Sequence, residues 1–435
     1  MKKEYTRLGI SASVIGTLLS LSSGQPLAGE TAGSSLMMGP KIVASHQVRA
    51  VVGPSVFVDA KGVVHLTWVS EDKEIRTVWY ARTDETGGKL GQAVQVNRPD
   101  EAPYLRQEAP ALVVTGETVL ITWALTHPKI SPEKPFANEL RLSRSTDGGR
   151  SFEPSIRVND DEQVITHSFD SLATSTSGAS YVAWIDGRDG KKEPGTYVTQ
   201  SMDGGRSVVK NLKIDEGTCV CCRTSLVTGP DGTIYVAWRK IYEGNIRETV
   251  VARSTDGGAT YSSPVIVGHD RWVYAGCPHR PASMSVDRQG RLFVVWYTEG
   301  EDEVPAVYAA FSDDRAQTFS PKIKLNLSKG TFPDHPQLAV DGAGRVVVVW
   351  EEQSPVRKEV VMSRSLDRGQ TFSAPTKLNE KKSQTPTISI NAEGRGAVAW
   401  MEHAMPGHKM VIQPFTLLSA RQAGLDQEQG TRATF

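Results

Sequence analysis

Charge of one sign, long apolar runs and cysteine are all scarce in this chain of 435 residues. Lys plus Arg and Asp plus Glu each number 49, which gives zero formal net charge, and no long run of one sign occurs. This balance argues against broad electrostatic binding to nucleic acid or anionic lipid. No apolar stretch after the N-terminal residues is long enough for a membrane span. The length fits two or three domains or one repeat array.

The N-terminal residues have the layout of a secretory signal. Lys2, Lys3 and Arg7 precede an apolar stretch from Leu8 to Leu21, and small residues follow. The stretch is too short to cross a bilayer comfortably. We therefore predict that residues 1–28 are a signal peptide and that the mature protein is periplasmic or secreted. The four cysteines can be oxidised in such a compartment.

Seven tryptophans recur at intervals of 50 to 61 residues, and each follows an apolar strand pattern such as VVHLTW, TIYVAW or RVVVVW. Most are preceded by a shorter strand and a tight turn rich in Asp, Asn and Gly, which supply the positive φ angles of two-strand hairpins. A third and a fourth strand pattern follow. The repeated tryptophans are Trp68, Trp123, Trp184, Trp238, Trp296, Trp350 and Trp400.

A repeat near 55 residues with four short strands and no amphipathic helix is typical of a β-propeller blade. The seventh repeat shows three strands but no evident fourth, and Gly39–Val43 fits the fourth-strand pattern. We therefore predict an all-β, seven-bladed propeller over residues 39–415, in which the N-terminal strand completes the last blade. Closure of the ring removes an exposed sheet edge. Residues 416–435 are predicted to be a polar tail.

The turns between third and fourth strands share the pattern S-x-D-x-G-x-x-aromatic. Clear copies start at Ser145, Ser254 and Ser365, and weaker ones at Ser201 and Ser312. These turns resemble the Asp boxes, or BNR repeats, of sialidase-like propellers. The Asp can accept backbone N–H groups, the Gly permits the bend and the aromatic ring packs on the sheet. The motif therefore indicates the fold rather than an activity.

The resemblance to active sialidases is weaker at the residues that carry activity. Sialidases use three arginines on the substrate carboxylate, a Tyr nucleophile with a Glu partner, and an acid/base Asp. Their Phe-Arg-Ile-Pro segment is replaced here by the sequence around Arg49, and their fold has six blades rather than seven. We assign no catalytic residue from this resemblance. Any enzyme activity would be that of a glycoside hydrolase of sialidase type.

The irregular loops are predicted to gather on one face of the ring, opposite the Asp boxes. These loops carry all four cysteines and eight of the nine histidines, and only His65 is expected within a strand. Polar side chains on the loops of a rigid scaffold are the usual layout of a binding site. The motif C-x-C-C followed by D-x-W and G-C-P resembles a group of exported bacterial sialidase-like proteins. Its main members are Cys219, Cys221, Cys222, Asp270, Trp272 and Cys277.

Three chemical interpretations of the cysteines stay open. Cys277 can form a disulfide with one of the other three, whereas adjacent Cys221 and Cys222 cannot bond to each other without strain. Alternatively, the thiolates and His279 can bind a soft metal ion, copper or zinc. A reactive thiol is the third alternative. The metal-ligand candidates are Cys219, Cys221, Cys222, Cys277 and His279.

Several arginines and one tryptophan on the same loops suit a small anionic or carbohydrate ligand. Guanidinium groups can bind a carboxylate in a bidentate manner, and an indole ring can stack on a sugar. The ligand-binding candidates are Arg223, Arg239, Arg247, Arg280 and Trp272.

Three functions therefore compete. The favoured hypothesis is an exported propeller that binds a small ligand or a soft metal ion at the Cys/His loops. The alternatives are an exo-glycosidase that acts on acidic sugars and a scaffold for periplasmic partner proteins. None of these three functions is expected to involve nucleic acid or a transmembrane segment.

Overall fold

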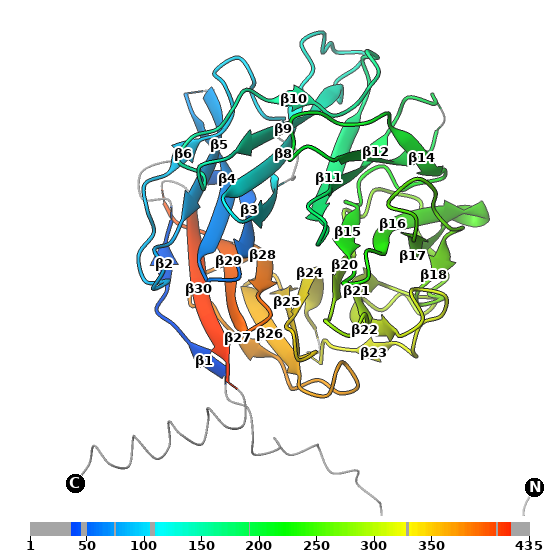
Figure 1. The fold of residues 1–435 in the computed structure, drawn as a ribbon. Helices are drawn as coiled ribbons and strands as arrows, with labels where there is room; N and C mark the ends of the chain where they lie inside the picture. Colours follow the sequence, from blue (N-terminus) through cyan, green and yellow to red (C-terminus); the bar gives the residue numbers. More distant parts are fainter. Residues whose placement is uncertain are drawn as a thin grey trace, which may run out of the picture. The chain divides into compact units, whose positions relative to one another are not determined.

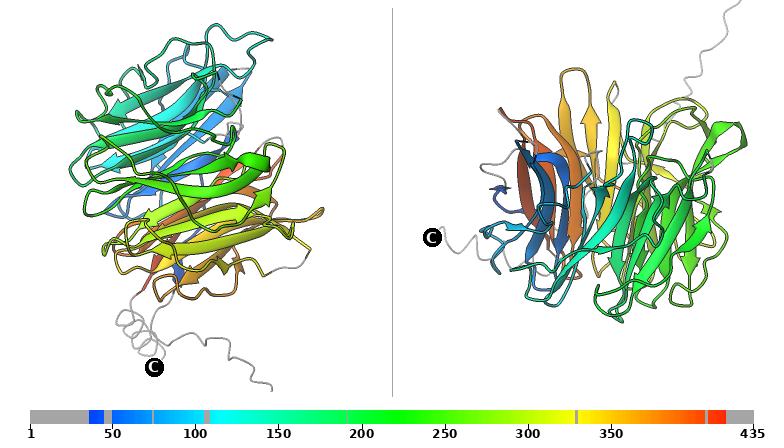
Figure 2. Two further views of the ribbon diagram at one scale, coloured as in Figure 1. Left: turned by 90° about the vertical axis from the view of Figure 1, so that its right-hand side faces the viewer. Right: turned by 90° about the horizontal axis from the view of Figure 1, so that it is seen from above.

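Seven antiparallel sheets follow one another along the chain and form a closed ring, as predicted (Figure 1). The computed structural model describes residues 36–44, 50–73, 75–104, 109–190, 192–327, 330–405 and 408–418. The predicted signal peptide and residues 419–435 lie outside the described residues. In each blade the first strand lies nearest the centre, and the later strands lie progressively farther out (Figures 1 and 2).

The blades take their strands in chain order. Blade 1 contains β3 (Ala50–Val58), β4 (Val64–Asp72), β5 (Ile75–Arg82) and β6 (Val94–Gln95). Blade 2 contains β7 (Ala111–Thr115), β8 (Thr118–Thr126), β9 (Asn138–Ser145) and β10 (Ile156–Arg157). Blade 3 contains β11 (His167–Thr174), β12 (Ser180–Asp186), β13 (Gly195–Ser201) and β14 (Leu212–Asp215).

Blade 4 has an additional short strand. It contains β15 (Ser225–Thr228), β16 (Ile234–Tyr242), β17 (Ile246–Ser254), β18 (Val265–Ile266) and β19 (Trp272–Val273). A 3-10 turn, Glu243–Asn245, links β16 to β17. Blade 5 contains β20 (Ser283–Val286), β21 (Leu292–Thr298), β22 (Ala306–Ser312) and β23 (Ile323–Lys324). Blade 6 contains β24 (Phe332–Val340), β25 (Val346–Gln353), β26 (Lys358–Ser365) and β27 (Thr376–Lys377).

Blade 7 joins the two ends of the described chain. Its strands are β28 (Ser383–Ile390), β29 (Arg395–Glu402) and β30 (Lys409–Leu417), and both β1 (Leu36–Met38) and β2 (Ile42–Val43) pair with β30. Figure 1 shows the blue N-terminal strands beside the red C-terminal one. The N-terminal segment therefore completes the last blade, as the sequence predicted.

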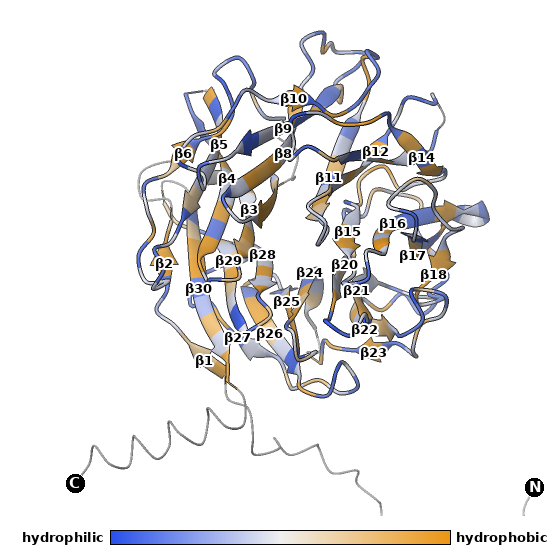
Figure 3. Ribbon diagram, viewed as in Figure 1, coloured by the Kyte–Doolittle hydropathy of each residue, from blue (hydrophilic) through white to orange (hydrophobic). Residues whose placement is uncertain are grey.

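The seven tryptophans hold the blades together. Each lies on the second strand of its blade and is almost fully buried. Each also packs in an apolar cluster shared with the preceding blade: Trp123 with Val69 and Val78 of blade 1, for example, and Trp68 with Ala399 of blade 7. Figure 3 shows the apolar residues as orange segments of the strands. The repeated tryptophan thus fills each interface between blades.

All five predicted Asp boxes have the same hydrogen bonds. In blade 4 the Ser254 hydroxyl donates to Asp256 and accepts the Gly258 N–H, while the Thr260 N–H and hydroxyl donate to Asp256. The turns at Ser145, Ser201, Ser312 and Ser365 repeat this pattern. The carboxylate closes the turn, which supports the structural role assigned from the sequence.

The ring has two chemically different faces. Arg247 near the start of β17 lies by the cysteine loops, and Ser254 at the end of β17 begins an Asp box, so the two lie at opposite ends of one strand. We call these the cysteine face and the Asp-box face. Within the described part of the chain, no helix is both long and apolar enough to cross a membrane.

Candidate functional site

The cysteine cluster forms where the entry to blade 4 meets the entry to blade 5. The segment before β15 runs beside the end of β16, since the Cys219 N–H donates to the Arg239 carbonyl at 2.8 Å. The strand β19, which precedes Cys277, pairs with the start of β17. Two connections that are far apart in sequence are thereby placed at the same edge of blade 4.

The four sulfur atoms lie close together, as the sequence predicted. A disulfide joins Cys221 and Cys277, whose Cα atoms are 6.1 Å apart. Cys219 and Cys222 are free thiols, and the Cys219 Sγ lies 3.8 Å from the Cys221 Sγ and 3.4 Å from the Cys222 Sγ. Cys277 is exposed, whereas the other three are buried. His279 lies beside the disulfide, within 4.8 Å of both of its sulfurs.

Two buried arginines surround the cluster. Arg247 donates to the Cys219 Sγ at 2.9 Å and to the carbonyls of Tyr274 and Gly276, each at 2.7 Å. Arg239 donates to the carbonyls of Arg280 and Tyr297. Neither guanidinium forms an ion pair with a carboxylate among the described residues. The sequence suggested that these arginines bind a ligand, and the structure uses most of their N–H groups to hold the loop 274–280.

The arginines also act on the thiols. A hydrogen bond with Cys222 lowers the pKa of the Cys219 thiol to about 6, and the charges of Arg247 and Arg239 add to this effect against the opposing effect of burial. Burial and the neighbouring Cys219 raise the pKa of Cys222 well above its ordinary value. One of the two free thiols therefore readily ionises, and the other holds its proton.

Trp272 packs on the buried side of this cluster. It is buried, its ring stacks on Tyr274 with centroids 5.1 Å apart, and the Arg239 guanidinium lies 5.0 Å from the centre of its ring. The stacking partner predicted for a sugar is thus enclosed by protein. Tyr274 remains exposed on the cysteine face.

The other two candidate arginines are half-buried. Arg223 donates to the Asp170 carbonyl, and burial raises the pKa of the Asp170 carboxyl despite the charge of Arg223. Arg280 forms an ion pair of 2.8 Å with Asp334 of blade 6, and its guanidinium lies 5.0 Å from the Tyr297 ring centre. Arg280 therefore connects the loop that carries Cys277 to the inner strand of the next blade.

A second polar group surrounds His335 in blade 6. Its Nδ1 lies 3.1 Å from Asp334 and 3.2 Å from Glu351, and the Gln353 amide donates to Glu351 at 2.6 Å. β24 is irregular between Asp334 and Gln337, and His335 has a φ of 45° there. The sequence placed His335 and His167 on connections. Both instead lie in the innermost strands of their blades. Each of these strands contains a bulge, and the strand continues beyond the bulge into the segment that the sequence assigned to the connection.

The His335 group predicts a pH dependence of stability. Burial would lower the pKa of His335, but Asp334 and Glu351 raise it to about 10, above the ordinary value near 6.5. A raised pKa stabilises the folded state at low pH, so this contribution is full below about pH 6.5 and is lost as the pH rises through about 10. We expect urea unfolding to show a falling free energy of unfolding over this window, and a flatter profile in His335→Gln. His403→Gln, an exposed histidine of blade 7, is the control and should keep the wild-type profile.

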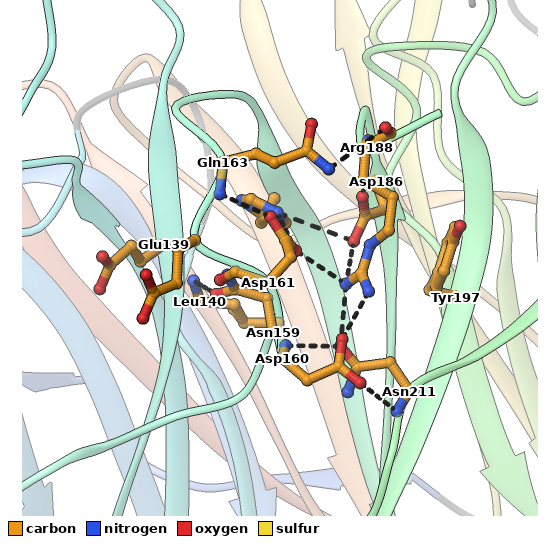
Figure 4. A network of polar contacts seen from close by, with 12 residues as sticks. Glu139, Leu140, Asn159, Asp160, Asp161, Gln163, Asp186, Arg188, Tyr197 and Asn211 are labelled. Atoms are coloured by element: carbon orange, nitrogen blue, oxygen red, sulfur yellow. Dashed lines mark hydrogen bonds and ion pairs between the residues drawn. The ribbon is translucent and has the colours of Figure 1, made fainter. Parts of the chain in front are cut away.

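A third group ties blade 2 to blade 3 (Figure 4). The His167 Nε2 lies 2.9 Å from Asp161, while Arg188 lies between Asp186 and Asp160. Burial alone would lower the pKa of His167, but its hydrogen bond to Asp161 and the charge of Asp186 raise it. Arg188 supplies the positive charge opposite the three carboxylates of this group. The group is a structural tie between blades.

Comparison with known proteins identifies the fold. No protein-family model matches this chain, and no curated protein matches its sequence. The solved polysaccharide lyase Uly1 aligns with a TM-score of 0.58 and 12% identity over 87% of this chain and 99% of its own. A PL25 ulvan lyase bound to -[GlcA(1-4)Rha3S]- aligns at 0.56 and 11%, over 83% and 93%.

A sialidase is also among the similar structures. The Hadza microbial sialidase Hz136 aligns with a TM-score of 0.48 and 15% identity, over 82% of this chain and 76% of its own. The two lyase alignments show that the chain shares the propeller fold of these polysaccharide lyases, and its five Asp boxes are the turns that resemble those of sialidase-like propellers.

Proposed function

We propose that this chain is an exported propeller that binds one soft metal ion, copper(I) or zinc(II), on its cysteine face. The ligands are the thiolates of Cys219, Cys221, Cys222 and Cys277, and His279 lies next to the last of the four. Clustered thiolates are the ligands that soft ions prefer in proteins.

The observation that carries this proposal is the pair of buried guanidiniums beside the sulfurs. A buried charge is costly unless an opposite charge compensates it, and Arg239 and Arg247 have no carboxylate partner among the described residues. Four thiolates around Zn(II), or three around Cu(I), have a net charge that two guanidiniums balance. In the disulfide form the Cys219 thiolate alone can offset only one of the two guanidinium charges.

The spacing of the sulfurs agrees with metal binding. With Zn–S bonds of about 2.3 Å, the sulfurs of a tetrahedral site lie about 3.8 Å apart. The Cys219 Sγ lies 3.8 Å from the Cys221 Sγ and 3.4 Å from the Cys222 Sγ. Only small side-chain movements would bring these sulfurs around one ion.

The metal-binding form is the reduced one. Opening the Cys221–Cys277 disulfide takes two electrons and two protons, which an external dithiol supplies while it becomes a disulfide itself. Cys277 is exposed and offers the point of attack. The bonds from Arg247 to the carbonyls of Tyr274 and Gly276 do not involve the disulfide, so they hold the loop in place after reduction.

Metal uptake by purified mature protein tests the proposal. We expect the fully reduced chain to retain about one equivalent of Cu(I) or Zn(II) after desalting, and the disulfide form to retain none. Thiol counting on each sample establishes its redox state. A reduced chain with four free thiols and no retained metal would reject the proposal.

Export is the second part of the proposal and is supported by the signal-like residues 1–28. Cell fractionation of the full chain and of a chain that starts at residue 29 tests it. We expect only the full chain to leave the cytoplasm and to lose its N-terminal residues. Equal retention of both in the cytoplasm would contradict export.

A second candidate function is a glycoside hydrolase for acidic sugars. The grouping of Asp334, His335 and Glu351 with Arg280 on the cysteine face favours it, because such a site combines an acid/base group with a carboxylate-binding cation. The similar polysaccharide lyases also support a carbohydrate ligand. Reducing-end release from a panel of acidic glycosides and polysaccharides tests it, with His335→Gln as control. Absence of turnover across the panel removes this candidate.

A further inference from the structure

A cavity of about 580 Å³ whose wall carries many charged residues lies on the Asp-box face, between blades 1 and 2. Its walls are the β3–β4 turn, the β5–β6 turn and the two turns of blade 2 that end near Glu117 and Arg150. All four turns lie on the face opposite the cysteine cluster. The cavity has the size of a small-molecule site and belongs to none of the groups described above.

The cavity occurs at the one turn where the repeat pattern fails. In blades 2 to 6 the turn between third and fourth strands is an Asp box, whose Asp closes the turn. Blade 1 instead has Thr83-Asp84-Glu-Thr-Gly-Gly, followed by Lys89 and Leu90, in which Asp84 accepts the Thr86 hydroxyl and the Gly88 N–H. This longer turn has no aromatic residue at its end to pack on the sheet. The space beside it stays open.

His65 is the second departure from the repeat. It lies three residues before Trp68, and this position is apolar or aromatic in each of the other blades: Leu120, Tyr181, Tyr235, Phe293, Val347 and Ala397. His65 is buried and lines the cavity, with its Nδ1 2.7 Å from the Tyr80 hydroxyl and its Nε2 3.5 Å from Asp59. A polar group thus replaces core packing only in the blade that has the cavity.

The Arg82 side chain indicates that the cavity favours a negatively charged ligand. It pairs with His65 across β4 and β5, which is the register that places Arg144 opposite Leu120 in blade 2. Arg144 forms an ion pair of 2.8 Å with Glu153. Arg82 is half-buried on the cavity wall, and its guanidinium forms no ion pair or hydrogen bond with any described residue. Its fork of N–H donors is therefore available to a ligand.

The other charged residues of the wall balance Arg82 in formal charge. Lys61 and Lys89 also line the cavity without an ion pair among the described residues. Of the four acidic residues on the wall, Asp59 accepts the Val63 N–H and Asp84 closes its own turn. The uncommitted acids are Glu85 and Glu117. With Arg150 the wall carries four cationic and four acidic side chains, so the case for an anion rests on the Arg82 guanidinium, which has no hydrogen-bond or ion-pair partner among the described residues.

We propose that this cavity binds a small oxyanion, a carboxylate or sulfate, carried on a polar body of the size of a sugar. The Arg82 guanidinium binds the oxyanion through two parallel N–H···O bonds, and Lys61 and Lys89 add positive charge at the rim. The site is independent of the metal centre proposed above.

Titration calorimetry with glucuronate, inorganic sulfate and glucose tests this site. We expect saturable binding of the oxyanions and none of glucose. Arg82→Gln should lower the affinity at least tenfold, and Arg82→Lys should lie between it and the wild type because it keeps the charge but not the fork. Arg253→Gln, at the same register position in blade 4 and outside the cavity, should leave the affinity unchanged.

The outcomes separate the sources of the oxyanion. Binding of glucuronate supports the proposed sugar acid, whereas binding of sulfate alone would overturn the sugar-sized body and leave a site for a free oxyanion. Equal binding of glucose and glucuronate, or equal affinity of Arg82→Gln and wild type, would overturn the proposal, as would absence of binding by both oxyanions. A Cys222→Ser chain should bind the oxyanion normally, so that failure of the metal centre does not affect this result.

Discussion

Replacing Cys222 by serine is expected to lower the affinity of the reduced protein for Cu(I) or Zn(II) by more than about 100-fold. Cys222 is buried, and its Sγ lies 3.4 Å from the Cys219 Sγ, so it contributes a central ligand rather than one at the rim. A serine hydroxyl is a hard donor that soft ions bind poorly. Competition with a chromophoric chelator measures the affinity.

The control for this variant is Met405→Leu. Met405 carries an exposed thioether, a soft donor, on blade 7, two residues after His403. Because Met405 belongs to a blade that does not contribute to the cysteine cluster, we expect Met405→Leu to bind metal as the wild type does. An affinity that falls in Met405→Leu but not in Cys222→Ser would place the metal elsewhere.

Deleting the N-terminal strands is expected to have the largest effect on stability. Both β1 and β2 pair with β30, and Leu36 and Ile42 pack on the apolar clusters of blade 7. Loss of these contacts removes about 3 kcal/mol or more of apolar burial and exposes the edge of β30 to other chains. A chain that starts at residue 45 should therefore unfold at lower temperature and aggregate.

A chain that starts at residue 35 provides the matched comparison. It keeps β1, β2 and every pairing of blade 7. Calorimetry should show its unfolding temperature close to that of the mature protein. Equal unfolding temperatures of the two shortened chains would show that the ring does not depend on the N-terminal strands for closure.

The propeller could be predicted because its signals are local and repeated. A tryptophan at the end of an apolar pattern and an Asp-box turn can each be recognised within a few residues, and the seven tryptophans give the number of blades. The faces followed from the alternation of strands. The fourth strand of blade 7, which the N-terminal segment supplies, was predictable for the same reason, since Gly39–Val43 repeats the pattern of the other fourth strands.

The site was predictable only in part. The sequence brought Cys219, Cys221, Cys222 and Cys277 together, because they lie on adjacent loops of the same face. It did not predict that Arg239 and Arg247 bind loop carbonyls, since the direction of an arginine side chain depends on the path of a second loop that comes much later in the chain. Trp272 was predicted to stack on a ligand, and its burial could not be predicted for the same reason: β19 pairs with β17 and places Trp272 inside the protein.

One signal for the cavity was present in the sequence. His65 was recognised as the histidine within a strand, but the meaning of that departure needed the register that aligns it with Leu120 and Tyr181. The unpaired state of Arg82 could not be inferred, because it depends on which carboxylates of the neighbouring turns bind their own backbone.

X-ray absorption spectroscopy on the reduced, metal-loaded protein tests the metal centre most directly. The account predicts a first shell dominated by sulfur, with metal–sulfur distances of about 2.3 Å for zinc. The sulfur contribution should fall in Cys222→Ser. A first shell of nitrogen and oxygen alone in the wild-type protein would contradict the assignment of the metal to the cysteine cluster.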